Sequence, residues 1–239
     1  MFPSDPQVLA ILSGAPPRDV SGVIAELRRL DAALADNDGL KWFNWLYLLI
    51  TRAVKQYLDT GQSQAARFIS ELDVAFAQLY RSALTAYLSG DDFPASWDAL
   101  FSCRGDPRIT RIQFALAGVN AHINRDLPIA LLTVDDERNL RPVHGGVEYV
   151  AYTDLNTTLD AEIGIAKQHL MVRLDGANLA SVDLLEIRIG AWSVAAAREA
   201  AWTNSEILFT LSAVPLQSRY EKMLDGFSQL SSKALLAPV

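Results

Sequence analysis

His122 and Asp126 are the residues whose types and spacing best suit catalysis, four positions apart in RIQFALAGVNAHINRDLPIALL, residues 111–132. Side chains four residues apart share one face of a helix. The Asp126 carboxylate can therefore hydrogen-bond one ring nitrogen of His122, which fixes the imidazole tautomer and raises its basicity. The spacing predicts half of a catalytic dyad, in which His122 is the general acid or base and Asp126 orients it.

Asp73 is the second candidate catalytic carboxylate. In the helix expected at 65–89 it falls on the apolar face, whereas Glu71 falls on the side that carries Arg67. A buried carboxylate is rare unless it is paired or functional. The sequence leaves two explanations open, a catalytic Asp73 and a structural one bonded to an arginine or a helix N-terminus.

The central stretch also carries amide side chains on another face. Gln113, Asn120 and Asn124 form a stripe that is rotated by roughly 160–200° from His122 at the helical repeat. A single pocket cannot easily collect both sets of polar groups. One set either binds substrate or bonds neighbouring helices.

Asn44, Asn156 and Arg198 are candidate pocket residues on other helices. Both asparagines interrupt apolar helix faces. Arg198 lies in an alanine-rich block, where its guanidinium could reach inward to an acid such as Asp73 or Asp126. For Asn44, a bond to a neighbouring backbone is the structural alternative.

The elements that must position these residues are helices. The central stretch has thirteen residues without formal charge between Arg111 and Arg125, which is typical of a buried helix, and Pro128 should kink it. Apolar spacing predicts further helices at 21–34, 40–60, 65–89, 95–103, 147–171, 182–211 and after Pro215. Residues 133–146 form the longest loop and a candidate lid.

These expectations describe one all-α domain. We predict an orthogonal or irregular bundle of about seven to eight helices around a buried central helix at about 108–127. Residues 1–20 contain four prolines and should form an extended arm with a short turn around Val8 to Leu12, while residues 21–239 form the single helical domain.

The composition argues against several classes of function. The 239 residues are 50% apolar and 21% charged with a net charge of −7, and no Lys/Arg-rich run suggests nucleic-acid binding. The longest apolar run has ten residues, half of the roughly 20 needed to span a membrane. One cysteine, Cys103, excludes an intramolecular disulfide. With no convincing signal peptide, we expect a cytoplasmic protein.

Several functions compete for this set of residues. The first is metal-free acid–base or electrostatic catalysis, as in a cyclase, isomerase or hydrolase, on a small and largely apolar metabolite. The second is a non-catalytic protein that binds a small molecule. The third is a metal hydrolase, which the three histidines support weakly. In the fourth, every polar group is a satisfied core residue. We expect no cofactor and a small-molecule partner, and a homodimer is conceivable.

Three strings, GLKWFNWLYLLIT (39–51), LDVAFAQLY (72–80) and RIQFALAGVNAHINRDLP (111–128), resemble a bacterial family of uncharacterised all-helical proteins, domain of unknown function 5995. The resemblance covers residues 37–132 well, and its most specific part is the string at 120–128. It implies no activity. It does single out a set of polar positions: Asn44, Tyr47, Asp73, Tyr80, Gln113, Asn120, His122, Asn124 and Asp126.

The chain departs from the family pattern at Ala151, where an acid is expected before Tyr152, and Glu148 could replace it. The segment from His122 to Pro128 is more faintly similar to one ligand segment of helical zinc phospholipases and nucleases, whose other histidine ligands are missing here. Together, spacing and resemblance predict these substrate-binding residues: Asn44, Tyr47, Tyr80, Gln113, Asn120, Asn124, Asn156 and Arg198.

Overall fold

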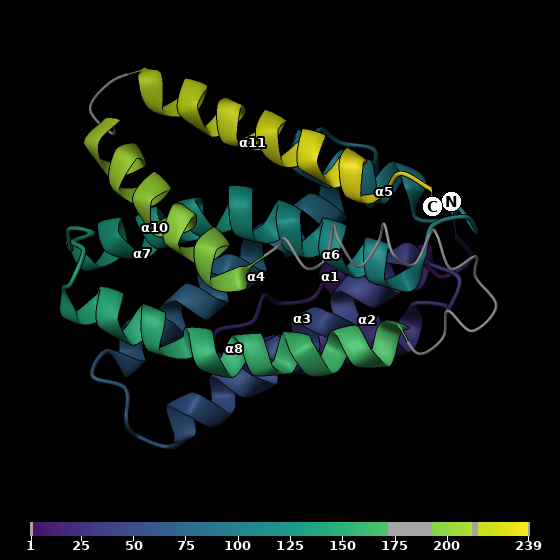
Figure 1. Ribbon diagram of the computed structural model, residues 1–239. Helices are drawn as coiled ribbons and strands as arrows, with labels where there is room; N and C mark the ends of the chain where they lie inside the picture. The colour runs from purple at the N-terminus through teal and green to yellow at the C-terminus, as the bar shows by residue number, and fades with distance from the viewer. Residues whose placement is uncertain (1, 172–192, 212–214, 239) are drawn as a thin grey trace.

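A computed structural model describes residues 2–171, 193–211 and 215–238, and within these ranges the chain is helical without any strand (Figure 1). The prediction of a single all-α domain is confirmed. The elements are α1 (Asp5–Leu12), α2 (Val20–Ala33), α3 (Gly39–Asp59), α4 (Ala66–Ser89), α5 (Ala95–Cys103), α6 (Arg111–Ala121), η1 (His122–Asp126), α7 (Leu127–Arg138), α8 (Val147–Met171), α10 (Val194–Leu211) and α11 (Leu216–Leu235).

Helix α6 is the centre of the bundle, as its uncharged sequence predicts. Every residue after Arg111 in this helix is buried. Helix α3 packs on one side of it and α11 on the other (Figure 1). A helix that is covered on all sides must satisfy its polar side chains inside the protein, so the partners of those side chains define what the interior can do.

Two glycines allow α3 and α6 to approach closely. A Cβ on Gly118 would lie 2.3 Å from Cγ of Phe43, and one on Gly39 would lie 2.5 Å from Cδ1 of Phe114. The absence of these side chains lets each phenylalanine ring rest directly on the facing backbone. Phe43 thereby reaches the ring of His122, with centroids 5.7 Å apart.

A π-helical turn, η1, joins α6 to α7 and accommodates Pro128. The amide of Leu127 bonds the carbonyl of His122, five residues back, and the proline falls in the first turn of α7. Proline is tolerated there because amides in the first turn of a helix have no helical partner. The disturbance expected at Pro128 thus takes the form of one wide turn, and that turn contains both His122 and Asp126.

The N-terminal region differs from the extended arm that its prolines suggest. Residues Asp5–Leu12 form α1, with Pro6 in its first turn, and Val8 and Leu12 are buried against the bundle. Arg104, at the end of α5, anchors α1. Its guanidinium bonds Asp5 at 2.6 Å and also pairs with Asp38. Asp38 in turn caps α3 by accepting from the amide of Leu40 at 3.0 Å.

The long loop is shorter than expected. Helix α7 continues through residues 133–138 because Val134 and Asp135 are buried, and it ends at Asn139 in a left-handed conformation with φ of 53°. Only residues 140–146 connect it to α8. The helix expected at 182–211 appears as α10, and its expected start lies outside the described residues. Among the described helices, none is long and apolar enough to cross a membrane.

Candidate functional site

The His122–Asp126 pair forms the hydrogen bond that its spacing predicts. Nδ1 of His122 lies 3.0 Å from Oδ2 of Asp126. The same oxygen accepts from Nε1 of Trp97 at 3.0 Å, and the other carboxylate oxygen accepts from Arg125 at 2.7 Å. Because Oδ2 of Asp126 accepts a hydrogen bond from this imidazole, the ring proton sits on Nδ1 and Nε2 carries a lone pair.

Burial determines the charge state of His122. The side chain is almost inaccessible, and desolvation lowers its pKa in spite of the opposing effect of the hydrogen bond to Asp126. The imidazole is therefore neutral at pH 7. Its Nε2 has no hydrogen-bond partner within the described part of the chain. A neutral imidazole with a fixed tautomer and an unpaired buried nitrogen is chemically a base.

Aromatic rings enclose this imidazole. Phe76 of α4 stacks on it with centroids 3.4 Å apart and planes 6° from parallel. Tyr47 meets it edge-on at 4.7 Å, and Tyr80 and Trp97 lie farther out at 6.2 and 5.8 Å. Phe76 is half-buried, whereas the other rings are buried. The ring of Phe76 thus covers one face of His122 and is the most accessible part of the cage.

Two small hollows of about 50 Å³ each lie beside this cage. Asp73 lines one of them and His122 the other, while Tyr47, Phe76 and Arg198 line both. The two candidate catalytic groups therefore face neighbouring spaces that share several lining side chains. Spaces of this size admit water-sized groups, and binding pockets for small molecules are typically about 300–1,000 Å³.

Asp73 is buried, as its place on the apolar face predicts. Desolvation raises its pKa to about 8. The carboxyl group is therefore largely protonated at pH 7, and its Oδ2 has no bonding partner among the described residues. A neutral carboxylic acid can donate a proton, which is the function opposite to that of His122.

The hydroxyl of Tyr47 lies close to these groups. Burial, followed by the charges of Asp73 and Asp126, raises its pKa well above its usual range. It stays neutral, and no partner for it is found in the described ranges. Tyr47 can therefore act as a hydrogen-bond donor to a bound molecule.

Arg198 brings a positive charge to both hollows. Its guanidinium donates to Oδ1 of Asn156 at 2.7 Å and to the carbonyl of Tyr152 at 2.6 Å, and it lies over the Tyr152 ring at 3.9 Å. Neither Asp73 nor Asp126 pairs with it, contrary to expectation, and burial lowers its pKa. The hydrogen-bond partners of the Arg198 guanidinium are thus uncharged, so its positive charge remains available to attract an anion.

The amide stripe of α6 and η1 bonds the C-terminal helix. Asn120 donates to the carbonyl of Ser228 at 2.8 Å and to the hydroxyl of Ser232 at 2.9 Å, and Asn124 donates to Asn120. Gln113 completes a capping box on α6 and donates to the carbonyls of residues 235 and 237. These three residues lie away from His122 and hold α11 in place.

Asn44 also bonds a neighbouring helix, and the sequence departure at Ala151 lies in the interior. The amide nitrogen of Asn44 donates to the carbonyl of Leu27 at 3.0 Å and so ties α3 to α2. Ala151 is buried. Glu148 lies near the buried Asp135, whose pKa is raised to about 7 by burial first and by the Glu148 charge second.

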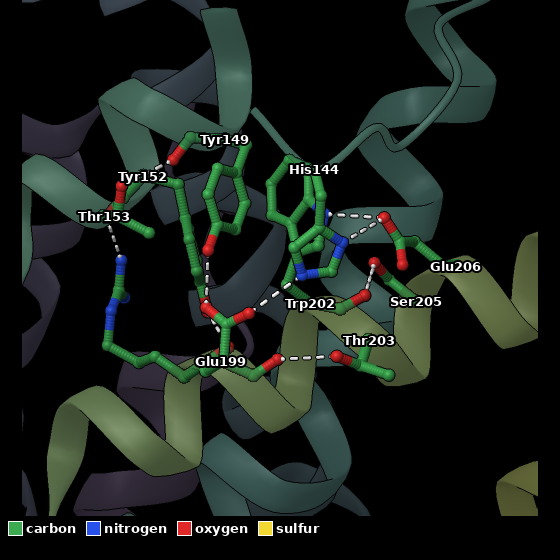
Figure 2. A network of polar contacts seen from close by, with 10 residues as sticks. His144, Tyr149, Tyr152, Thr153, Glu199, Trp202, Thr203, Ser205 and Glu206 are labelled. Atoms are coloured by element: carbon green, nitrogen blue, oxygen red, sulfur yellow. Dashed lines mark hydrogen bonds and ion pairs between the residues drawn. The ribbon is translucent and has the colours of Figure 1, made fainter. Parts of the chain in front are cut away.

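Sequence reasoning missed a polar cluster where the 140–146 loop meets α10 (Figure 2). His144 lies between two carboxylates, with Nδ1 2.7 Å from Glu206 and Nε2 2.8 Å from Glu199. Tyr149 donates to Glu199 at 2.8 Å, and Trp202 donates to Glu206 at 3.1 Å. The spacing of Glu199 and Glu206 on one helix was the only available signal, because nothing in the sequence shows that the loop returns there.

Metal binding has little support in the described part of the chain. No group of three or more His, Cys, Asp or Glu side chains is arranged there to hold a metal ion. Around His122 the donors are one imidazole and one carboxylate that is already bonded to Trp97 and Arg125. The metal-hydrolase alternative therefore has no ligand set in these ranges.

Comparison with known proteins gives a family but no activity. Neither the curated proteins nor the solved structures contain a match to this chain. A family model described as "Family of unknown function (DUF5995)" matches residues 20–238, which is nearly the whole sequence and agrees with the resemblance of residues 37–132. The chain belongs to this family of unknown function.

Proposed function

We propose that the protein is an enzyme that catalyses proton transfer on a small, largely apolar substrate with one anionic group. The observation that carries this proposal is the unpaired Nε2 of His122, a buried nitrogen on a neutral imidazole whose other nitrogen is fixed by Asp126. Isomerisation and cyclisation are reactions of this class. We place it in the cytoplasm, in keeping with the single cysteine and ordinary composition.

Each polar group has a distinct role in this proposal. Nε2 of His122 accepts a proton from the substrate, and Asp126 stabilises the imidazolium that forms. Asp73, which is protonated at neutral pH, donates a proton or a hydrogen bond to the oxygen where negative charge develops. Arg198 binds the anionic group, held ready by Asn156.

Substrate entry requires Phe76 to move. The two hollows together are smaller than a typical ligand site, and this ring lines both of them and stacks on His122. Phe76 is half-buried, so in this proposal a rotation of its side chain uncovers one face of the imidazole. The other residues that line the two hollows are aliphatic or aromatic. We therefore expect the rest of the substrate to be apolar.

The proposal is tested with His122→Gln, compared with His169→Gln. Glutamine can still bond Asp126 but cannot take up a proton, whereas His169 is exposed and stacks on Trp45 away from the site. The purified proteins are incubated with a deproteinised extract of small metabolites and analysed by mass spectrometry. We expect compounds that change with the native protein and His169→Gln but not with His122→Gln. The same turnover in all three would refute catalysis by His122.

A non-catalytic binding protein is the second candidate, favoured by the charge of Arg198 inside an otherwise apolar lining. This alternative predicts an anionic molecule that co-purifies unchanged and is detected by native mass spectrometry. His122→Gln would leave its binding largely intact, whereas Arg198→Met would abolish it. The two candidates thus differ in which substitution has the larger effect.

A further inference from the structure

Two unpaired hydrogen-bond donors line the hollow that contains Asp73. The hydroxyl of Tyr47 and Oδ2 of Asp73 have no partner among the described residues, and the two side chains are only 3% and 9% exposed. Burial raises the pKa of each group, so both are largely protonated at pH 7. Each protonated group can donate a hydrogen bond, and two donors in one small space can bond the same acceptor oxygen.

The base His122 faces the neighbouring hollow, which Tyr47 also lines. Nε2 of His122 is unpaired in the described part of the chain, and the ring of Tyr47 meets the imidazole edge-on with centroids 4.7 Å apart. Tyr47 is therefore near both the base and the acid. Once Phe76 has moved, a molecule that reaches both hollows can bond Tyr47 and Asp73 through an oxygen and present a neighbouring C–H group to Nε2.

A base and two neutral donors suit a substrate with a carbonyl group. A C–H group becomes acidic enough for an imidazole when the electron pair left behind can move onto an oxygen. Phenol and carboxylic acid donors stabilise the oxygen on which that negative charge develops, whereas an ionised carboxylate would repel it. A ketone acidifies the adjacent C–H group more than an ester or a carboxylate does. The substrate class that uses all of these groups is therefore a ketone with a hydrogen on the adjacent carbon.

The single cation of the site favours a carboxylate as the anionic group of the substrate. Arg198 is the one side chain with a positive charge at pH 7 among the described residues that line the two hollows. Its Nε and Nη2 bond Asn156 and Tyr152, whereas Nη1 has no hydrogen bond within residues 2–171, 193–211 and 215–238. A carboxylate carries one charge and matches one guanidinium. A phosphate carries close to two and would leave a charge uncompensated in an apolar space.

We propose that the substrate is a short oxo acid, with a carboxylate that binds Arg198 and a ketone oxygen that accepts from Tyr47 and Asp73. This assignment rests on the function proposed above, since it names the substrate class of the same site. The substrate is short because each hollow measures only about 50 Å³.

The reaction step is an enolisation. Nε2 of His122 takes the proton from the carbon next to the ketone, and the C–H electron pair forms a C=C bond. The π pair of the carbonyl moves to its oxygen, which takes the proton of Asp73 and becomes an enol hydroxyl. Return of the two protons, to the same carbon or to another, completes exchange or isomerisation.

The first experiment follows deuterium exchange into a defined oxo acid. The full-length protein is incubated with α-ketobutyrate in heavy water near neutral pH, and proton NMR measures the loss of signal at the carbon next to the ketone. We expect exchange at least about a hundredfold faster than in protein-free buffer. Protein-dependent exchange of butanone, which lacks the carboxylate, should be at least about tenfold slower. Butyrate, which lacks the ketone, should not exchange.

Substitutions identify the groups that bind the probe. Tyr47→Phe removes only the hydroxyl and should slow the exchange of α-ketobutyrate by about a hundredfold. Tyr57→Phe is the matched control, because Tyr57 is half-buried on the same helix but lines neither hollow, and it should not change the rate. Arg198→Met should abolish the preference for α-ketobutyrate over butanone. Comparison of the two probes with the native chain tests the carboxylate even if that variant does not fold.

The outcomes distinguish the substrate class from the proposed function. Absence of protein-dependent exchange with α-ketobutyrate, an equal rate with butanone, or an unchanged rate in Tyr47→Phe would each overturn the oxo-acid assignment. In that case, turnover of another class of metabolite that still requires His122 would leave catalysis by proton transfer standing. Exchange of α-ketobutyrate that persists in His122→Gln would instead refute His122 as the base, and with it the proposed function.

Discussion

Asp73 shows at the scale of one residue how burial sets a charge state. Its pKa is raised to about 8 by desolvation, so the folded chain binds this proton more tightly than the unfolded chain, in which an Asp has its ordinary pKa of about 3.8. Folding is therefore favoured by this group below about pH 4, and that contribution is lost as the pH rises toward 8.

Asp73→Asn should remove the loss of stability that Asp73 causes as the pH rises, since an amide resembles the protonated acid. We expect little change in the free energy of unfolding at pH 4 and a gain that grows by up to about 1.4 kcal/mol per pH unit as the pH rises toward 8. Urea unfolding at several pH values measures it. Glu71→Gln is the control, because Glu71 is only partly buried and pairs with Arg67. A gain independent of pH would contradict the protonated state of Asp73.

The residues of the candidate site were predictable only where the signal was local. The His122–Asp126 bond follows from a four-residue spacing, and the burial of Asp73 follows from its helix face. The role of Trp97 did not follow, because it reaches Asp126 from 29 residues away. No pattern in one sequence shows which side chain closes over another across such a separation.

At the scale of elements, the helix ends were predictable where composition changes sharply. Helix α3 was expected at 40–60 and spans Gly39–Asp59, and α4 was expected at 65–89 and spans Ala66–Ser89. Prolines were the source of error. They suggested an extended arm where α1 forms and a kink where the chain makes the π-helical turn, because Pro6 and Pro128 each lie in the first turn of a helix.

Gly118 tests the close packing of α3 on α6. Gly118→Ala would place a methyl group too close to Cβ and Cγ of Phe43, so that side chain or the helix must shift. We expect a loss of about 1–3 kcal/mol in the free energy of unfolding, despite the better helix propensity of alanine. Gly164→Ala on α8, where a Cβ meets nothing within 4 Å, should instead stabilise slightly. Equal effects of the two substitutions would contradict the close approach.

The loop of residues 140–146 should be held to α10 in a limited pH range. Hydrogen bonds to Glu199 and Glu206 raise the pKa of His144, so this contact is complete below about pH 6.5 and is lost as the pH rises through the raised value. The pKa of Glu199 is lowered by its bonds to His144 and Tyr149. The contact is therefore also lost when the pH falls through that lowered value.

Amide hydrogen exchange of the loop measures this behaviour, after correction for the intrinsic pH dependence of exchange. We expect protection to decrease toward alkaline pH in the native chain and to be low and constant in His144→Ala. The exchange of α6, the buried central helix, serves as the internal control. Protection that is unchanged by the substitution would show that the loop is held by other contacts.

At the scale of the molecule, Arg104 connects three parts of the chain. It is buried and pairs with Asp5 at the start of α1 and with Asp38 at the start of α3, and burial is outweighed by these bonds, which raise its pKa. Asp5 lies before the residues matched by the family model, which begin at position 20. Through Arg104, α1 is nevertheless part of the folded core.

Arg104→Met should therefore destabilise the whole protein and not only α1. The substitution leaves two buried carboxylates without a cation, which typically costs about 3–5 kcal/mol in the free energy of unfolding. Arg108→Met is the matched control, because Arg108 pairs with Asp106 at 2.6 Å but is 73% exposed, and it should cost less than about 1 kcal/mol. Thermal unfolding followed by circular dichroism compares them. If Arg104→Met removed only a small early transition and left the main one unchanged, α1 would be an appendage of the bundle. A single transition at lower temperature is expected instead, because Asp38 also caps the helix that packs on α6.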